Sequence, residues 1–185
     1  MLICRHMNLL QRLFAPKHDP RAAWRPLYQA VVAHGRDPLW YHAGAPDTLD
    51  GRFDMIAAVL SHLLIRLEGD ASHEAPVASA MLTELFVADM DGQLRQIGIG
   101  DLVVGKHIGR MMSALGGRMG AYRAAAGHAD ALAAPLVRNL WRGEDPGEAK
   151  VAAVAALLAR FAYDLGETPT EVLLAGQLPP IAVAA

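Results

Sequence analysis

Two aspartates separated by one residue, Asp89 and Asp91, are the strongest candidates for catalysis in this chain. They follow an apolar run in the segment FVADMDGQLRQ, residues 86–96, which looks like the motif of phosphatases that use an aspartyl nucleophile. There Asp89 would attack phosphorus and Asp91 would act as acid and base. That chemistry needs both carboxylates at the end of a parallel strand, whereas helical patterns lie on both sides. The alternative is an acidic helix face on which Asp91 and Arg95 pair at i,i+4 spacing.

A second polar group lies in the segment YHAGAPDTLDGRFDM, residues 41–55, and contains His42, Asp47, Asp50 and Asp54. Such residue types can bind a metal, but their spacing matches no metal-ligand pattern, and no calcium loop or paired-histidine motif is present. Asp47 is well placed to be the N-cap of a helix that starts near residue 49, with Asp50 in its first turn. We therefore expect no metal and no cofactor in this segment.

The segment GDLVVGKHIGRMMSALGGRMGAY, residues 100–122, predicts a helix with two stripes. One stripe is apolar, and the other consists of small residues. Each interior glycine destabilises a helix by roughly 1 kcal/mol relative to alanine, so several of them need a reason. Either a neighbouring helix of the domain packs closely there, which we favour, or the stripe receives a helix from outside. Lys106 and Arg110 place a basic rim beside it, and the P-loop spacing is absent. The small stripe comprises Gly105, Gly109, Ser113, Gly116 or Gly117, and Gly120.

Composition and charge limit the classes of protein that the chain can belong to. It has 185 residues, of which 53% are hydrophobic and 19% charged, and one cysteine, so an internal disulfide is excluded. No apolar run is long enough to predict a transmembrane helix. Charge alternates along the chain: residues 1–52 carry +3, 53–101 carry −6, 102–142 carry +5 and 143–185 carry −4. The basic segment predicts either an outside contact with RNA, anionic lipid or an acidic partner, or pairing with the acidic segments inside the fold.

The elements that must position these residues all have helical periodicity. Residues 1–23 read as a basic, amphipathic N-terminal segment whose functional start is Met1 or Met7, and residues 24–185 as one all-α domain of about six or seven helices. His62 lies in the most apolar of these helices, which predicts a hydrogen-bonded core histidine rather than a catalyst. The expected helices cover residues 24–34, 53–67, 76–94, 102–123, 130–142 and 148–164, with a short last helix opened by Thr168 and Pro169.

Two blocks of this sequence resemble the ubiquinol–cytochrome c chaperone family. The first block is YH followed by APDTLDGRFDM, ending at Met55. The second is ADMD, LR and GIGDLVVGK, within residues 88–106. The resemblance covers roughly residues 24–163, and the blocks are long and in the right order.

The resemblance implies an all-helical, non-enzymatic assembly factor without a cofactor. Family members help newly made cytochrome b reach ubiquinol–cytochrome c reductase, and mitochondrial members act with a smaller helper protein and associate with the ribosome. For this chain we expect a bacterial cytoplasmic location, with peripheral contact at the inner membrane, rather than the mitochondrial matrix. The alternatives are a ribosome- or RNA-binding factor and the aspartate-based phosphatase. The expected functional surface comprises Tyr41, Asp47, Asp50, Arg52, Phe53, Asp54, Asp89, Asp91, Arg95, Gly100, Asp101, Gly105, Lys106, Gly109 and Arg110.

Overall fold

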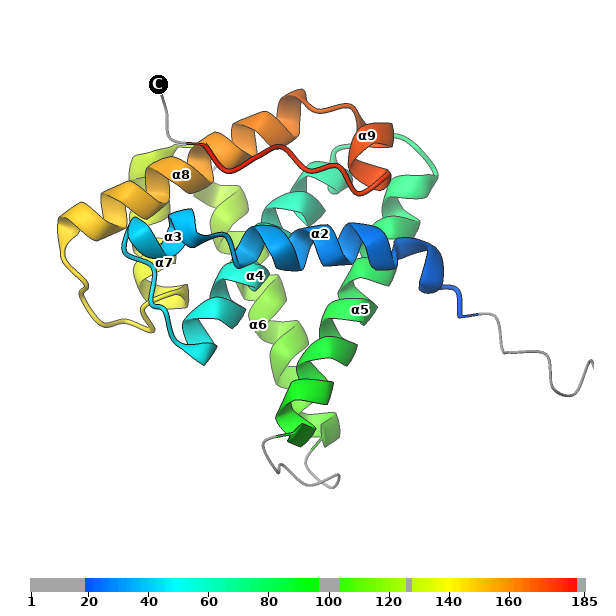
Figure 1. Ribbon diagram of the computed structural model, residues 1–185, viewed down its shortest axis with the longest axis horizontal. Coiled ribbons are helices and arrows are strands. Elements are labelled where there is room, and N and C mark those ends of the chain that lie inside the picture. Colours follow the sequence, from blue (N-terminus) through cyan, green and yellow to red (C-terminus); the bar gives the residue numbers. More distant parts are fainter. Residues whose placement is uncertain (1–18, 97–103, 126–127, 183–185) are drawn as a thin grey trace, which may run out of the picture.

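The structure, a computed structural model, describes residues 19–96, 104–125 and 128–182 (Figure 1). Within these ranges every regular element is a helix, which confirms the all-α prediction. Six helices have eleven residues or more, and two have five. In chain order the elements are the 3-10 helix η1 (Ala22–Trp24) and the α-helices α2 (Arg25–Gly35), α3 (Pro38–His42), α4 (Leu49–Glu68), α5 (Glu74–Gln96), α6 (Val104–Ala125), α7 (Ala129–Asn139), α8 (Glu148–Glu167) and α9 (Thr170–Leu174).

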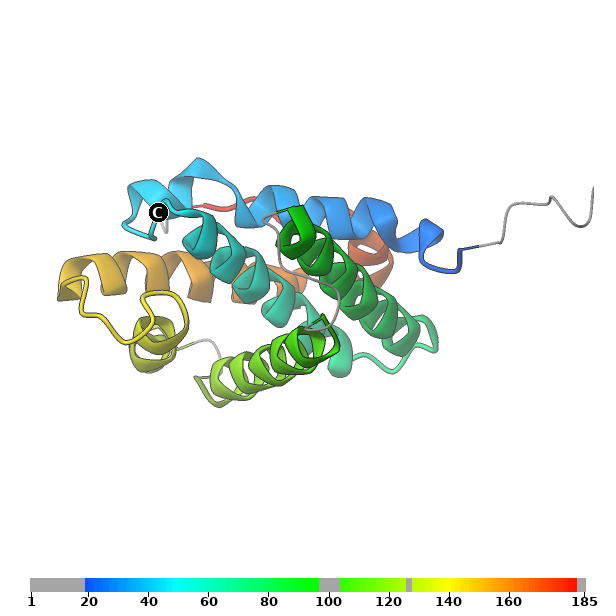
Figure 2. The ribbon, with the colours of Figure 1, turned by 90° about the horizontal axis from the view of Figure 1, so that it is seen from below.

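Helix α4 lies at the centre of the domain (Figure 2), where it contacts α2, α5, α6 and α8. Every residue from Asp54 to Leu64 is buried, as expected of a helix that is apolar on all sides. Its buried polar groups are satisfied locally: the Ser61 hydroxyl donates to the Ala57 carbonyl at 2.6 Å, and His62 Nδ1 lies 2.9 Å from the Ala58 carbonyl oxygen. The prediction that His62 is a hydrogen-bonded core residue is confirmed.

Helix α2 crosses α4 at a glycine. A Cβ atom on Gly35 would lie 2.6 Å from the Ile56 Cα, so only glycine allows the two backbones to approach this closely. The following helix, α3, was not predicted. It forms because Asp37 accepts a hydrogen bond from the Leu39 N–H at 2.9 Å and Pro38 occupies the first helical position. Helix α3 then buries Trp40, whose Nε1 donates to the His34 carbonyl at 2.8 Å.

The C-terminal part of the chain closes the domain over α2 and α8. Arg66 of α4 donates to the carbonyl oxygens of Leu165 and Thr168 at 3.1 and 3.2 Å, which satisfies the last turn of α8. The chain then turns through α9 and runs back past α2, where His34 Nε2 lies 3.1 Å from the Pro179 carbonyl oxygen. Figure 1 shows α5 and α6 projecting together beyond the other helices, so one side of α6 lies at the surface.

Candidate functional site

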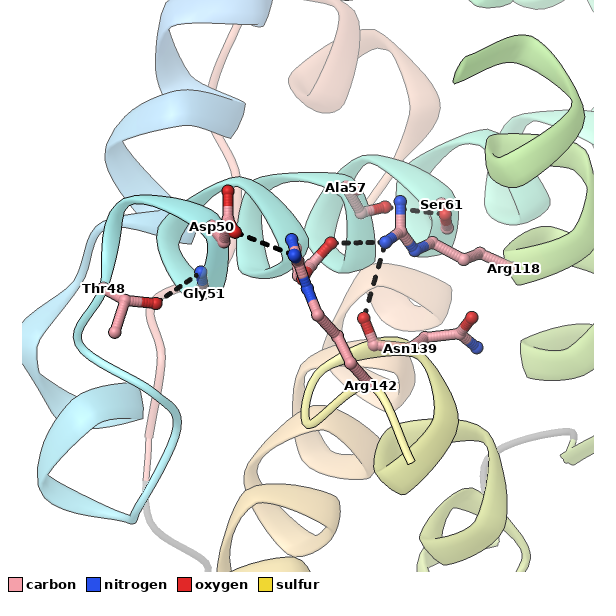
Figure 3. A network of polar contacts seen from close by, with 9 residues as sticks. Thr48, Asp50, Gly51, Ala57, Ser61, Arg118, Asn139 and Arg142 are labelled. Atoms are coloured by element: carbon pink, nitrogen blue, oxygen red, sulfur yellow. Dashed lines mark hydrogen bonds and ion pairs between the residues drawn. The ribbon is translucent and has the colours of Figure 1, made fainter. Parts of the chain in front are cut away.

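A buried carboxylate, Asp54, connects three parts of the fold. Its side chain is 6% exposed and pairs with Arg118 Nη2 of α6, while Arg142 Nε, from the α7–α8 connection, lies 3.4 Å away. Arg142 Nη1 also donates to Asp50 at 2.7 Å. Figure 3 shows Arg118 and Arg142 reaching α4 from two different elements. We call Asp50, Asp54, Arg118 and Arg142 the Asp54 cluster, and it fixes the position of α6 relative to α4.

Arg142 reaches the cluster from an unusual backbone conformation. Arg142 has φ +57°, a left-handed conformation that is uncommon for a residue other than glycine. It lies in the turn after α7, where the Gly143 N–H donates to the Val137 carbonyl at 2.9 Å, and its side chain pairs with Asp50 and Asp54. Burial raises the pKa of Asp54, and the charges of Arg118 and Arg142 oppose that rise. Two cations therefore surround one buried carboxylate, an arrangement that suits structural locking more than proton transfer.

The first turn of α4 corrects one prediction. Asp47 is not the N-cap of α4; Thr48 is, and its hydroxyl accepts from the Gly51 N–H at 3.0 Å. Asp47 instead accepts from Arg52 Nε at 2.7 Å. A side chain on Gly51 would collide with the Pro46 carbonyl oxygen, so only glycine fits at this position of the first turn.

The aromatic residues of the first motif are also accounted for by structure. The Arg52 guanidinium lies 5.7 Å from the Tyr41 ring centre, a cation–π contact, and the Tyr41 hydroxyl donates to the Gly35 carbonyl at 2.8 Å. Phe53 is half-buried against the core. The motif residues are therefore brought together around the start of α4, where most of their contacts order the fold.

The two candidate aspartates of the phosphatase reading lie inside α5. The phosphatase mechanism requires the two carboxylates at the end of a parallel strand, whereas both lie within a helix. The phosphatase prediction is therefore wrong about the local structure. Asp89 accepts a hydrogen bond from the Tyr28 hydroxyl of α2 at 2.8 Å. Burial is the largest cause that raises the pKa of Tyr28, and the hydrogen bond to Asp89 raises it further. Among the described residues, no group of three or more His, Cys, Asp or Glu could hold a metal ion.

Several predicted site residues lie where the structure gives no side-chain description. Gly100 and Asp101 fall outside the described residues. Arg95 belongs to α5, and Gly105, Lys106 and Arg110 belong to α6, but the structure describes only the backbone at these four positions. Their roles, and the predicted Asp91–Arg95 pair, remain predictions.

The small-residue stripe of α6 faces solvent, which overturns the favoured prediction of close packing inside the domain. A Cβ atom added to any of four glycines would meet nothing within 4 Å. Leu115 and Tyr122 on the opposite side are buried, and Met119 is half-buried. Among the residues of the predicted apolar stripe, Val104, Ile108 and Met111 lie outside the side-chain description. We define the α6 glycine face as the exposed residues Gly109, Met112, Ser113, Gly116, Gly117 and Gly120.

Three arginines of the basic segment pair within the fold, as one of the two sequence predictions proposed. Arg118 and Arg142 pair with Asp54, and Arg123 Nη2 lies 2.5 Å from Glu68. Arg118, Arg142 and Tyr28 were not among the expected site residues. The alternating charge of the chain indicated that the basic segment containing Arg142 could pair with the acidic segments. It did not identify which residues form the pairs. No signal pointed to Tyr28.

Comparison with known proteins agrees with this architecture. The family model described as "Ubiquinol-cytochrome C chaperone" matches residues 41–182. The crystal structure of the Cbp3 homolog from Brucella abortus is similar to this fold, with a TM-score of 0.77 and 29% sequence identity over 96% of this chain and 97% of that one. No curated protein matches significantly. Because the family match spans well over half of its residues, the chain belongs to the ubiquinol–cytochrome c chaperone family.

Proposed function

We propose that this chain is a non-enzymatic assembly chaperone that binds newly made cytochrome b and promotes assembly of ubiquinol–cytochrome c reductase. Membership of the family supports a role in assembly of this complex. The observation that carries the proposal is the α6 glycine face, because its glycines weaken the helix without any packing gain inside the domain. A client helix that packs on this face explains why α6 contains these glycines.

The face suits a membrane helix of the client. Small residues let two helix backbones approach closely, and this is how helices of membrane proteins commonly pack. Met112, 44% exposed, adds an adaptable apolar side chain at the same surface. No described helix of the chaperone is long and apolar enough to cross a membrane. The proposed location is the bacterial cytoplasm with peripheral contact at the inner membrane, where an apolar client segment would be exposed during assembly.

The motif residues support this face in two ways. The Asp54 cluster holds α6 against α4 and so orients the glycine face. We propose that Lys106 and Arg110, on the N-terminal half of α6, supply charged contacts at its rim, and that Gly105 extends its small surface. A contact with the ribosome and a requirement for a small helper protein are further proposals that follow from the family resemblance.

Capture of the client from detergent-solubilised native membranes tests the proposal. Tagged wild-type protein should recover apo-cytochrome b, identified by mass spectrometry, and the Lys106→Glu/Arg110→Glu variant should lose it. The matched control is Lys150→Glu/Arg160→Glu on α8, which makes the same change in net charge and should retain capture. Recovery of ribosomal proteins alone would move the function to translation. Equal capture by both double variants would remove Lys106 and Arg110 from the client surface.

A further inference from the structure

The last described residues of the chain, 175–182, follow α9 and belong to no helix or strand. We call them the C-terminal strap. Figure 1 shows the strap running from α9 back toward the opposite end of α2. Near its start, Gly176 lies beside Leu27 in the first turn of α2. Further on, Leu178 packs against the core and Ile181 is buried. Because no ladder of backbone hydrogen bonds holds the strap, other groups must keep it in place.

One polar contact links the second half of the strap to α2. His34 Nε2 lies 3.1 Å from the Pro179 carbonyl oxygen, and His34 Nδ1 lies 2.9 Å from the Ala30 carbonyl oxygen. Within the part of the chain that the structure describes, residues 178–182 form no other hydrogen bond. The position of this half of the strap therefore depends on the side chain of His34.

The number of donors on His34 decides whether both contacts are hydrogen bonds. Both oxygens belong to carbonyl groups, which accept hydrogen bonds and cannot donate them. A neutral imidazole has one N–H, so it can donate to only one of the two oxygens and turns a lone pair toward the other. The protonated ring has two N–H groups and donates to both. We propose that the C-terminal strap is a pH-sensitive switch, docked on α2 when His34 is protonated and released over its second half when His34 is neutral.

The charged groups around His34 leave the two carbonyl oxygens as its partners, since it makes no ion pair with any described residue. The strap carries no titratable side chain. On α8, the Phe161 ring centre lies 6.0 Å from that of His34, and the charged residues beside it, Arg160 and Asp164, pair with each other at 2.8 Å. Helix α4 presents Ile56 to this end of α2. The titratable residues that follow His34 along the chain to the end of α3 are Arg36, Asp37, Tyr41 and His42.

His62 provides an internal comparison. Its Nδ1 also faces the carbonyl four residues back, 2.9 Å from the Ala58 oxygen, but among the described residues its Nε2 faces no second hydrogen-bond acceptor. One N–H satisfies this site, and burial lowers the pKa of His62 to about 4. His62 should therefore stay neutral over the pH range in which an ordinary histidine changes charge, near pH 6.5.

NMR of the full chain between pH 5.5 and 8 tests the switch. Imidazole 15N signals report the charge of His34, and the methyl signals of Leu178 and Ile181 report whether the strap is docked. As His34 loses its second proton, the ratio of docked to released strap should fall about tenfold, which is typical for the loss of one hydrogen bond from a charged donor. The His62 signals should show a neutral ring throughout. The measurement needs no client, so its outcome is independent of the proposed function.

Two variants separate His34 from the other histidines. His34→Gln keeps an amide N–H for the Pro179 carbonyl but does not titrate, so the methyl signals should no longer change with pH. His42→Gln removes an exposed histidine of α3 and should keep the full pH dependence. Three results would overturn the proposal. They are methyl signals that do not follow the titration of His34, the same pH dependence in His34→Gln as in the wild type, and loss of the pH dependence in His42→Gln.

Discussion

Replacing two exposed glycines of α6, Gly116 and Gly120, by alanine should stabilise the protein. A Cβ atom at either position meets nothing within 4 Å, so alanine introduces no collision. Each replacement removes backbone freedom from the unfolded chain and adds helix propensity, about 0.5–1 kcal/mol per site. The double variant should therefore gain roughly 1–2 kcal/mol in its free energy of unfolding, which corresponds to a Tm rise of about 2–8 °C for a chain of this length.

Leucine at the same two positions separates stability from binding. Gly116→Leu/Gly120→Leu keeps the gain in helix propensity but covers the α6 glycine face with branched side chains. If a client helix docks there, capture of apo-cytochrome b should fall while the Tm stays at or above that of the wild type. Gly166 of α8 is a matched control, since it is exposed, helical and has no neighbour within 4 Å of an added Cβ. Gly166→Leu should leave capture unchanged.

Urea unfolding and membrane capture together test whether the α6 glycine face is exposed and whether a client helix docks there. A loss of stability in Gly116→Ala/Gly120→Ala would mean that these glycines pack against part of the protein, and the exposed face would be refuted. Full capture by Gly116→Leu/Gly120→Leu would refute the docking surface and leave the glycines unexplained. We expect Gly116→Leu/Gly120→Leu to be at least as stable as the wild type and to lose capture of apo-cytochrome b.

Three further predictions concern the core. Asp54→Ala should lower the free energy of unfolding by about 3 kcal/mol, because it leaves the largely buried Arg118 without its partner. Urea unfolding should show a smaller loss in the double variant Asp54→Leu/Arg118→Leu. A loss in the double variant equal to the sum of the losses in the two single variants would contradict the pairing. Burial lowers the pKa of His62 from 6.5 to about 4, so between these pH values the unfolded chain binds a proton that the folded one excludes, and stability should fall by up to about 3 kcal/mol as the pH drops through this window. Unfolding measured at both ends of the window should show a smaller fall in His62→Leu; an equal fall would mean that His62 is not the group responsible. Gly35→Ala should destabilise by more than 1 kcal/mol, since its Cβ would meet the Ile56 backbone; an unchanged Tm would show that α2 and α4 can separate at no cost.

The sequence predicts the helices well because their apolar periodicity is local, and the buried sides of α4 and α8 follow directly from it. It placed the N-cap of α4 at Asp47, one residue before the actual cap, Thr48. Both are good capping residues, but the Asp47 side chain accepts from Arg52 Nε, and the Thr48 hydroxyl accepts from the Gly51 N–H. Helix α3 was missed because its five residues are too few to show a period.

The tertiary contacts of the candidate site lay beyond any local pattern. Arg142 and Asp54 are 88 residues apart in sequence, and pairing over that distance depends on how α4, α6 and α7 pack. The small-residue stripe of α6 was visible from its spacing. The direction that it faces depends on the rotation of α6 against its neighbours, and this rotation is set by buried residues on the other side, such as Leu115 and Tyr122.

The central position of α4 has a consequence for the synthesis of the chaperone itself. Helix α4 ends at Glu68, but α8, which covers one of its sides, begins only at Glu148. During translation the most apolar helix of the domain therefore leaves the ribosome about 80 residues before its last neighbour. Long-range contacts of this kind slow folding, because the loop between the partners must close first. A fragment that stops before α8 exposes the side of α4 that α8 covers, so the nascent chaperone passes through a stage in which it has the same need for protection as its proposed client.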